Sequence, residues 1–226
     1  MSDYDVASKM GLPVPDTIED AVRQRDILVR EVHHRIKNNL QGVAGLLQHM
    51  ASGKPEVATQ LNEIAGQIQA IAQVHGLQIG AAGTLPVLGV VQGIFNNLGL
   101  MFGVEVRLAP SASALWRWGL PEGEAVPLAL VINELGTNAI KYRESRDLTL
   151  DVRIEARADG LAVQIQNAGR LPAGFELGRI SSGVSGLGLV KALLPRRGAQ
   201  LSLEQKEDRV IATLDLSPPA VREDLI

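Results

Sequence analysis

The chain has 226 residues, a formal net charge of −3 and no cysteine. It is long enough to bury a core without cross-links, and its 46% hydrophobic and 21% charged residues exclude a chain that is disordered throughout. The acidic balance argues against a dedicated nucleic-acid-binding protein, because such a protein needs a basic face. The lack of cysteine excludes disulfide scaffolds, thiolate zinc sites and thiol nucleophiles, and it agrees with a cytoplasmic location.

Hydropathy predicts neither a signal peptide nor a membrane span. Residues 1–15 contain acidic side chains and lack an apolar run. The most hydrophobic stretch, 85–104, is interrupted by Gln92, Asn96 and Asn97, whereas a spanning helix needs about 20 nearly uninterrupted apolar residues. We therefore expect a buried helix in this stretch and no membrane insertion.

A heptad pattern dominates the N-terminal part of the chain. The sequence predicts a helix over 17–50, capped by Asp16 or Thr17, then a turn over 51–55 and a second helix. Two narrow apolar seams cannot both be buried by one pair of antiparallel helices, so we predict that residues 16–80 form a hairpin that dimerises into a four-helix bundle. The two apolar rows of the first helix repeat every seven residues and consist of Val22, Val29, Ile36, Val43 and Met50, and of Leu40 and Leu47.

Residues 84–217 have a mixed pattern that predicts a layered α/β sandwich. The fold class is therefore α+β, a helical hairpin followed by this sandwich. A loop over 110–121 holds both tryptophans, a glycine-rich loop spans 169–186, and the tail from 217 is expected to fray. Helices are expected over 86–102, 123–143 and 187–194, and strands over 105–109, 149–156, 161–166, 200–205 and 210–216.

The first predicted helix carries two adjacent histidines in a polar run. A helix turns by about 100° per residue, so His33 falls at the edge of the apolar seam and His34 points into solvent. An exposed neutral imidazole is nucleophilic near neutral pH. Glu31 and Asn38 share the face of His34, where Glu31 could orient the ring or take its proton and Asn38 could hydrogen-bond a phosphoryl oxygen. Periodicity alone favours the simpler alternative, a solvated face with an incidental histidine.

A second polar cluster lies on the helix predicted over 123–143. Glu134, Asn138 and Lys141 are spaced four and three residues apart and share one face. Asn138 could bind Mg²⁺, which prefers hard oxygen ligands, and Lys141 could offset phosphate charge. Glu134 could position a water or act as a base. Taken alone, this face is better explained as a charged helix surface.

The third element is a run of glycines that opens the helix predicted over 187–194. Gly183, Gly186 and Gly188 would let backbone amides approach phosphate groups, and the helix dipole adds attraction. The run is neither the dinucleotide fingerprint nor a phosphate loop of the Gly-Lys-Ser type. By itself it is a weak signal.

Together and in this order, the three elements resemble sensor histidine kinases of the HWE-like subgroup. Residues 31–41 are similar to the phosphoacceptor box, 133–142 to the N box and 186–189 to the second glycine box at the end of the ATP lid. The resemblance covers about residues 17–216. It implies a dimerisation and phosphotransfer hairpin followed by an ATP-binding domain of the GHKL type.

The resemblance also implies roles for individual residues. His34 would be the phosphoacceptor, with Glu31 and Asn38 beside it, and Glu134 the acidic residue of the N box. Asn138 would bind the magnesium ion, Lys141 the phosphates and Tyr142 the adenine side. The remaining nucleotide contacts would come from Asn167 and Gly169 and from Gly183, Gly186, Leu187 and Gly188.

The chain departs from the family pattern at two places. Asn167 stands where an aspartate usually reads the adenine amino group, and Arg170 and Leu171 stand where a second glycine is expected. A neutral carbonyl is a weaker acceptor than a carboxylate. Arg35 replaces the acidic residue that usually follows the acceptor histidine, which leaves Glu31 as the candidate base.

These patterns predict a cytoplasmic, homodimeric histidine kinase that uses ATP and Mg²⁺. The kinase would phosphorylate His34 and pass the phosphoryl group to an aspartate of a response-regulator receiver domain. Input could come from a sensor protein in trans. Two alternatives stay open at this stage: a histidine phosphotransfer adaptor with a degenerate ATP site, and a non-catalytic dimeric scaffold.

Overall fold

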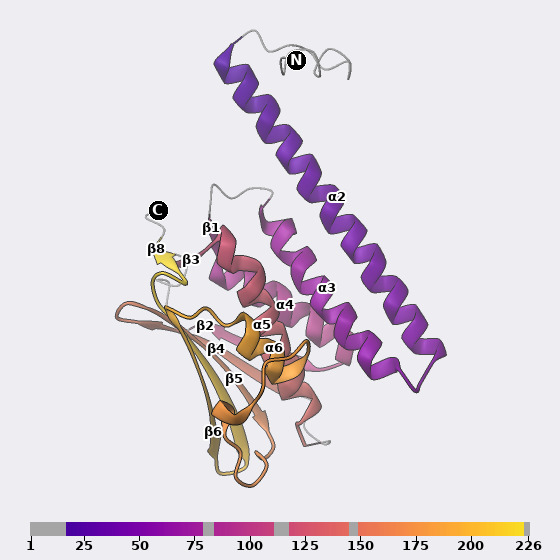
Figure 1. Ribbon diagram of the computed structural model, residues 1–226, viewed down its shortest axis with the longest axis vertical. Coiled ribbons are helices and arrows are strands. Elements are labelled where there is room, and N and C mark those ends of the chain that lie inside the picture. Colours follow the sequence, from indigo (N-terminus) through magenta and orange to yellow (C-terminus); the bar gives the residue numbers. More distant parts are fainter. Residues whose placement is uncertain (1–16, 79–83, 111–117, 145–148, 224–226) are drawn as a thin grey trace.

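A computed structural model describes residues 17–78, 84–110, 118–144 and 149–223. The chain starts with a hairpin of two long helices, α2 (Ile18–Gly53) and α3 (Ala58–Gln78) (Figure 1). Thr17 caps α2, since its side chain accepts a hydrogen bond from the Asp20 backbone at 3.1 Å. The helix ends three residues later than the sequence predicts, because Ala51 is buried in the hairpin and keeps the last turn helical.

The long helix α2 is only partly covered by α3. Its N-terminal part runs past the end of α3 (Figure 1). Only Ala44 and Ala51 of α2 are buried. The large apolar side chains that remain exposed along α2 are Ile18, Val22, Ile27, Leu28, Val29, Val32, Val43, Leu46 and Met50.

The second part of the chain packs helices on one face of a sheet. The helices are α4 (Val87–Phe102), α5 (Glu122–Lys141) and α6 (Gly186–Leu193), with a 3-10 turn η2 (Leu177–Arg179). The strands are β1 (Thr84–Pro86), β2 (Glu105–Pro110), β3 (Trp118–Pro121), β4 (Thr149–Arg157), β5 (Gly160–Ala168), β6 (Ala199–Lys206), β7 (Arg209–Leu216) and β8 (Arg222–Glu223).

The main sheet has five strands in the order β2-β4-β5-β7-β6. Strand β2 pairs parallel with β4, and the other pairs are antiparallel. Helices α4 and α5 bury a mainly aliphatic core with this sheet. The observed architecture is α+β, a helical hairpin followed by an α/β sandwich, which confirms the predicted fold class.

A small second sheet, β1-β3-β8, corrects two sequence-based expectations. Residues 118–121 were expected in a loop, but they pair with residues 84–86 as antiparallel strands. The tail was expected to fray, yet Ala220 and Val221 are fully buried and β8 pairs with β3. Two- to four-residue strands leave no alternation for a sequence to display, which explains the error.

The hydrophobic stretch 85–104 forms β1 and α4, whose apolar face lies in the core. Among the described residues, no helix combines the length and the apolar character that a membrane span requires.

Candidate nucleotide and phosphoacceptor site

His34 lies exposed on α2, where its helical phase predicts it. Glu31, almost one turn earlier, accepts a hydrogen bond from Arg35 Nε at 2.7 Å. This hydrogen bond and the positive charge of Arg35 hold the pKa of Glu31 below its usual value. Asn38 is also exposed. The three residues therefore form an open polar face with an ionised carboxylate near the imidazole.

The neighbouring histidine has a different environment. His33 and His75 of α3 bring their Nδ1 atoms to 3.1 Å, with ring centroids 5.4 Å apart. One Nδ1 must donate a proton and the other must accept it, so a single proton lies between the two Nδ1 atoms. Burial, followed by the charge of His33, lowers the pKa of His75, while a hydrogen bond with Gln78 opposes the change. His33 thus joins the two helices of the hairpin, and His34 does not.

Glu134 lies where three elements meet. It is 3% exposed, although the sequence placed it on a polar face. Its Oε1 accepts from Gln67 Nε2 of α3 at 2.9 Å, and its Oε2 accepts from the backbone N–H of Gly186 at 2.8 Å. The carboxylate therefore links the hairpin and the start of α6 to α5. These two bonds give each oxygen of the buried carboxyl group a hydrogen-bond partner.

Helix α3 also contacts the end of α5. Lys141 forms an ion pair with Glu63 of α3. One turn away, a Cβ on Gly66 would lie 3.6 Å from both polar atoms of the Asn133 carboxamide. Hence the hairpin covers the polar face of α5, and this explains why Asn133 is buried.

A pocket of about 410 Å³ opens beside α5. Asn138 and Tyr142 line it from α5, Asn167 from the end of β5, and Gly186, Leu187 and Gly188 from the start of α6. An apolar cavity with a few polar groups is the common form of a small-molecule site. The rest of its lining is Leu135, Ala139, Arg170, Leu171, Pro172, Phe175, Ile180, Leu203, Val210 and Ala212.

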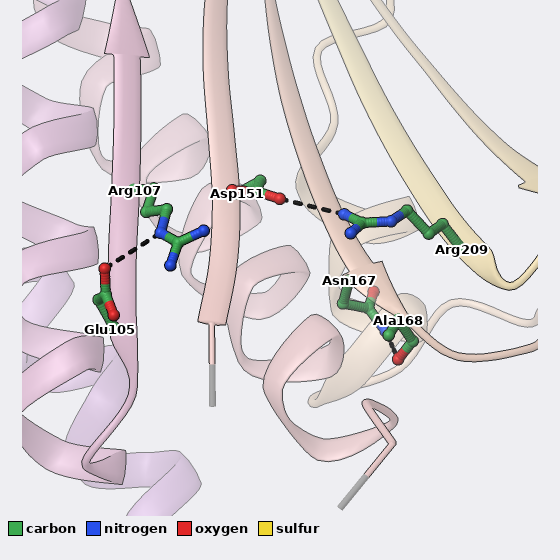
Figure 2. A network of polar contacts seen from close by, with 6 residues as sticks. All are labelled: Glu105, Arg107, Asp151, Asn167, Ala168 and Arg209. Carbon is green, nitrogen blue, oxygen red and sulfur yellow. Dashed lines mark hydrogen bonds and ion pairs between the residues drawn. The ribbon is translucent and has the colours of Figure 1, made fainter. Parts of the chain in front are cut away.

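Two carboxamides are among the polar groups of the pocket. Asn138 Nδ2 is buried and has no hydrogen-bond partner within the described part of the chain. Such an atom carries a free-energy penalty that a ligand oxygen would remove. Asn167 Nδ2 donates to the Ala168 carbonyl at 3.0 Å, which leaves Oδ1 as an acceptor (Figure 2).

An ion pair steadies the sheet beside Asn167. Arg209 of β7 contacts Asp151 of β4 at 3.1 Å, reaching across the intervening strand β5 (Figure 2). This contact lies next to Ala168, which is registered with Arg209. The ion pair therefore links the two strands that flank the end of β5.

The glycine-rich segment needs its glycines for two separate reasons. Gly186 has φ +59°, a left-handed conformation that only glycine adopts readily. A Cβ on Gly188 would lie 3.0 Å from both Gly183 N and Ser181 O, so the loop packs closely on α6. Lys191 holds the preceding turn, because its Nζ donates to the carbonyl oxygens of Gly178 at 3.1 Å and Ile180 at 2.5 Å.

Four predicted residues lie near the pocket without lining it. Glu134 and Lys141 face α3, as described. Gly169 is buried, and a Cβ there would lie 2.7 Å from the Tyr142 carbonyl oxygen, while Gly183 packs on Gly188. The contacts of Glu63 and Gln67 of α3 with α5 were not predicted from the sequence, because the periodicity of one helix does not show which other helix covers it.

Comparison with known proteins gives consistent matches. Residues 31–100 match the HisKA_2 histidine kinase family. The sensor histidine kinase PdtaS of Mycolicibacterium smegmatis is 30% identical over 182 residues, which is 77% of this chain and 36% of that protein. PdtaS of Mycobacterium tuberculosis is 30% identical over 184 residues. The chain thus spans about a third of the length of these relatives.

Solved structures show the same fold. The histidine kinase domain of the blue-light activated histidine kinase EL346 from Erythrobacter litoralis superposes with a TM-score of 0.58 at 20% identity, covering 88% of this chain and 94% of that chain. A longer structure of EL346 gives a TM-score of 0.54, covering 90% of this chain and 61% of that chain. The hairpin and the sandwich of this chain are therefore found together in a known architecture.

Proposed function

Since the chain carries the sequence signature and the fold of a sensor histidine kinase core, we propose that it transfers the γ-phosphoryl group of ATP to His34. The observation that supports this most is the combination of an exposed His34 with a separate pocket lined by Asn138, Tyr142 and Asn167. One chain thus carries a phosphoacceptor imidazole and a cavity suited to a nucleotide.

The pocket suits ATP because its two ends differ in chemistry. Asn167 and the apolar wall would hold adenine, with Asn167 Oδ1 accepting from the amino group. Gly186, Gly188 and Lys141 would face the phosphates, where backbone N–H groups at a helix start attract anions. Asn138 would ligate Mg²⁺ together with phosphate oxygens and water, and this ion would neutralise charge that develops during transfer.

In the proposed reaction, a ring nitrogen of His34 forms a bond to the γ-phosphorus. The bond from that phosphorus to the β–γ bridging oxygen breaks, and ADP leaves. The ring proton passes to Glu31, which the adjacent Arg35 keeps ionised, or to water. Glu134 would hold the Gly186 amide in place through the bond already present.

The phosphoryl group would then pass from His34 to an aspartate of a response-regulator receiver domain. We also propose a homodimer, because α2 exposes a stripe of large apolar side chains that include Val22, Val29, Val43 and Met50. A second copy of the chain would cover this stripe as a four-helix bundle. A sensor protein in trans could act on the same helix.

Labelling with γ-labelled ATP tests the proposal. The wild-type chain should become labelled, His34→Ala should lose the label, and His33→Ala should keep it. Label that persists in His34→Ala would refute the assignment. A chain that binds no ATP but accepts phosphate from another phosphoprotein would instead be an adaptor.

Calorimetry with Mg–ATP tests the pocket itself. Asn138→Ala should abolish measurable nucleotide binding, because it removes the proposed magnesium ligand. The helix content should stay as in the wild type. Unchanged affinity would show that the nucleotide lies elsewhere.

A further inference from the structure

We propose that Gln205 is a positioning residue for the nucleotide, acting through the loop at residues 169–171. This inference rests on the proposed function. Gln205 lies on β6, two residues after Leu203, which lines the pocket. Alternate residues of a strand share a face, so both side chains extend toward the same side of the sheet.

The Gln205 carboxamide holds two backbone groups of this loop. Its Oε1 accepts from the Leu171 N–H at 2.8 Å, and its Nε2 lies 3.2 Å from the Gly169 carbonyl oxygen. The carbonyl oxygens of Glu207 at 2.8 Å and Arg209 at 3.2 Å also lie within hydrogen-bond distance of Nε2, so the three acceptors share its two hydrogens. A single side chain therefore fastens the loop to the β6–β7 turn.

A backbone bond at the tip of this turn adds to the attachment. The Gly169 N–H donates to the Asp208 carbonyl at 2.8 Å. Glu207 next to it has φ +53°, a conformation that is costly for a residue with a side chain. The bond from Gln205 to the Glu207 carbonyl supports the turn in this conformation.

The location explains why such a fastening matters. The loop carries Arg170 and Leu171, which line the pocket together with Pro172. It begins two residues after Asn167, the proposed reader of adenine. Without Gln205, the Leu171 N–H and the Gly169 carbonyl lose their partners, and the base-side wall of the pocket is no longer held in one position.

Gln205→Ala tests the role, with Gln200→Ala as the matched control. Gln200 is the same residue type on the same strand, at the end away from the pocket. For Gln205→Ala we expect the Kd for a fluorescent ATP analogue to rise about tenfold. The KM for ATP in His34 labelling should rise similarly while kcat stays at the wild-type value, and Gln200→Ala should change neither.

Gln205→Glu serves as a second variant of nearly the same shape. Its carboxylate can still accept from Leu171 N–H but repels the three carbonyl oxygens, so its Kd should rise at least as much. A wild-type Kd in both Gln205 variants would overturn the proposal. A fall in kcat without a change in KM would also overturn it, because it would point to a general structural defect.

Hydrogen exchange separates this inference from the proposed function. In the nucleotide-free protein, the Leu171 amide should exchange faster in Gln205→Ala than in the wild type and in Gln200→Ala. Equal exchange rates would refute the fastening of the loop. A wild-type chain that binds no nucleotide would refute the proposed function and with it the nucleotide role of Gln205. Faster exchange of the Leu171 amide in Gln205→Ala would still show that Gln205 holds the loop.

Discussion

Lys141, the proposed phosphate-binding lysine, is paired with Glu63 of the hairpin. The two side chains come from α5 and α3, and both are partly exposed to solvent. Partial burial lowers the pKa of the Lys141 ammonium, and Glu63 supplies a negative charge beside it. In the proposed nucleotide complex, the ammonium would therefore exchange the Glu63 carboxylate for a phosphate group.

Glu63→Gln should tighten nucleotide binding. The change keeps the shape of the side chain, frees the Lys141 ammonium and removes a negative charge near the phosphates. The Kd for a non-hydrolysable ATP analogue should fall about two- to fivefold, given the small net energy of partly exposed ion pairs. Glu56→Gln, an exposed position in the turn between α2 and α3, is the control. Equal or weaker binding by Glu63→Gln would show that Lys141 does not contact the phosphates.

Asn167 should select adenine over guanine. Because its Nδ2 donates to the Ala168 carbonyl, Oδ1 would be the atom that meets the base, and an acceptor suits the adenine amino group but not the guanine carbonyl. Asn167→Ala should weaken ATP-analogue binding about tenfold, whereas Asn167→Asp retains an acceptor and should still bind. Gln166→Ala, on the other face of β5, should leave the affinity unchanged. Equal binding of ATP and GTP analogues by the wild type would contradict this orientation.

Stability should fall at acidic pH because of the His33–His75 pair. Folding depresses the pKa of His75, so the unfolded chain binds more protons at low pH. The stabilisation is complete above the ordinary histidine pKa of 6.5 and is lost as the pH falls below it. Lys37, whose side chain packs on Gly76 of α3, adds a further positive charge beside the pair.

Thermal unfolding at pH 7.5, 6.5 and 5.5 measures this effect. The Tm of the wild type should drop toward pH 5.5, and His75→Gln should make the drop smaller. His49→Gln, an exposed histidine on α2, is the control and should leave the pH profile unchanged. A profile that His75→Gln does not alter would show that the pair titrates alike in the folded and unfolded chains.

Gly186→Ala should destabilise the start of α6. An alanine in the left-handed conformation costs about 1–2 kcal/mol, so the free energy of unfolding in urea should fall by about that amount. The Gly186 N–H also shifts away from Glu134 if the backbone relaxes, and ATP-analogue affinity should then decrease. Gly178→Ala, where a Cβ meets nothing within 4 Å, should be neutral in both assays. Wild-type stability of Gly186→Ala would mean that the loop adopts another conformation.

The sequence allowed good prediction of features that repeat along the chain. The heptads and helical phase placed His34 in solvent and His33 at the seam, and the structure has His34 exposed and His33 in contact with α3. These patterns are visible because the spacing of apolar residues along a helix shows which of its faces is buried.

Contacts between distant segments could not be predicted in the same way. Glu134 belongs to a polar face in the sequence but is buried, because α3 packs over it with Gln67. Gln205 lies among charged residues that look like a solvated hairpin tip. Its role depends on a loop that lies 34 residues earlier in the chain.

The two oxygens of Glu134 make the glycine-rich loop and the hairpin mechanically dependent on each other. If Gly186 swings outward, Oε2 is left as a buried acceptor without a hydrogen-bond donor, and if α3 withdraws, the same happens to Oε1. Either displacement therefore raises the energy of the Glu134 side chain, which also binds the segment that has not moved. A rotation imposed on the hairpin from outside would reach the rim of the pocket through this one carboxylate.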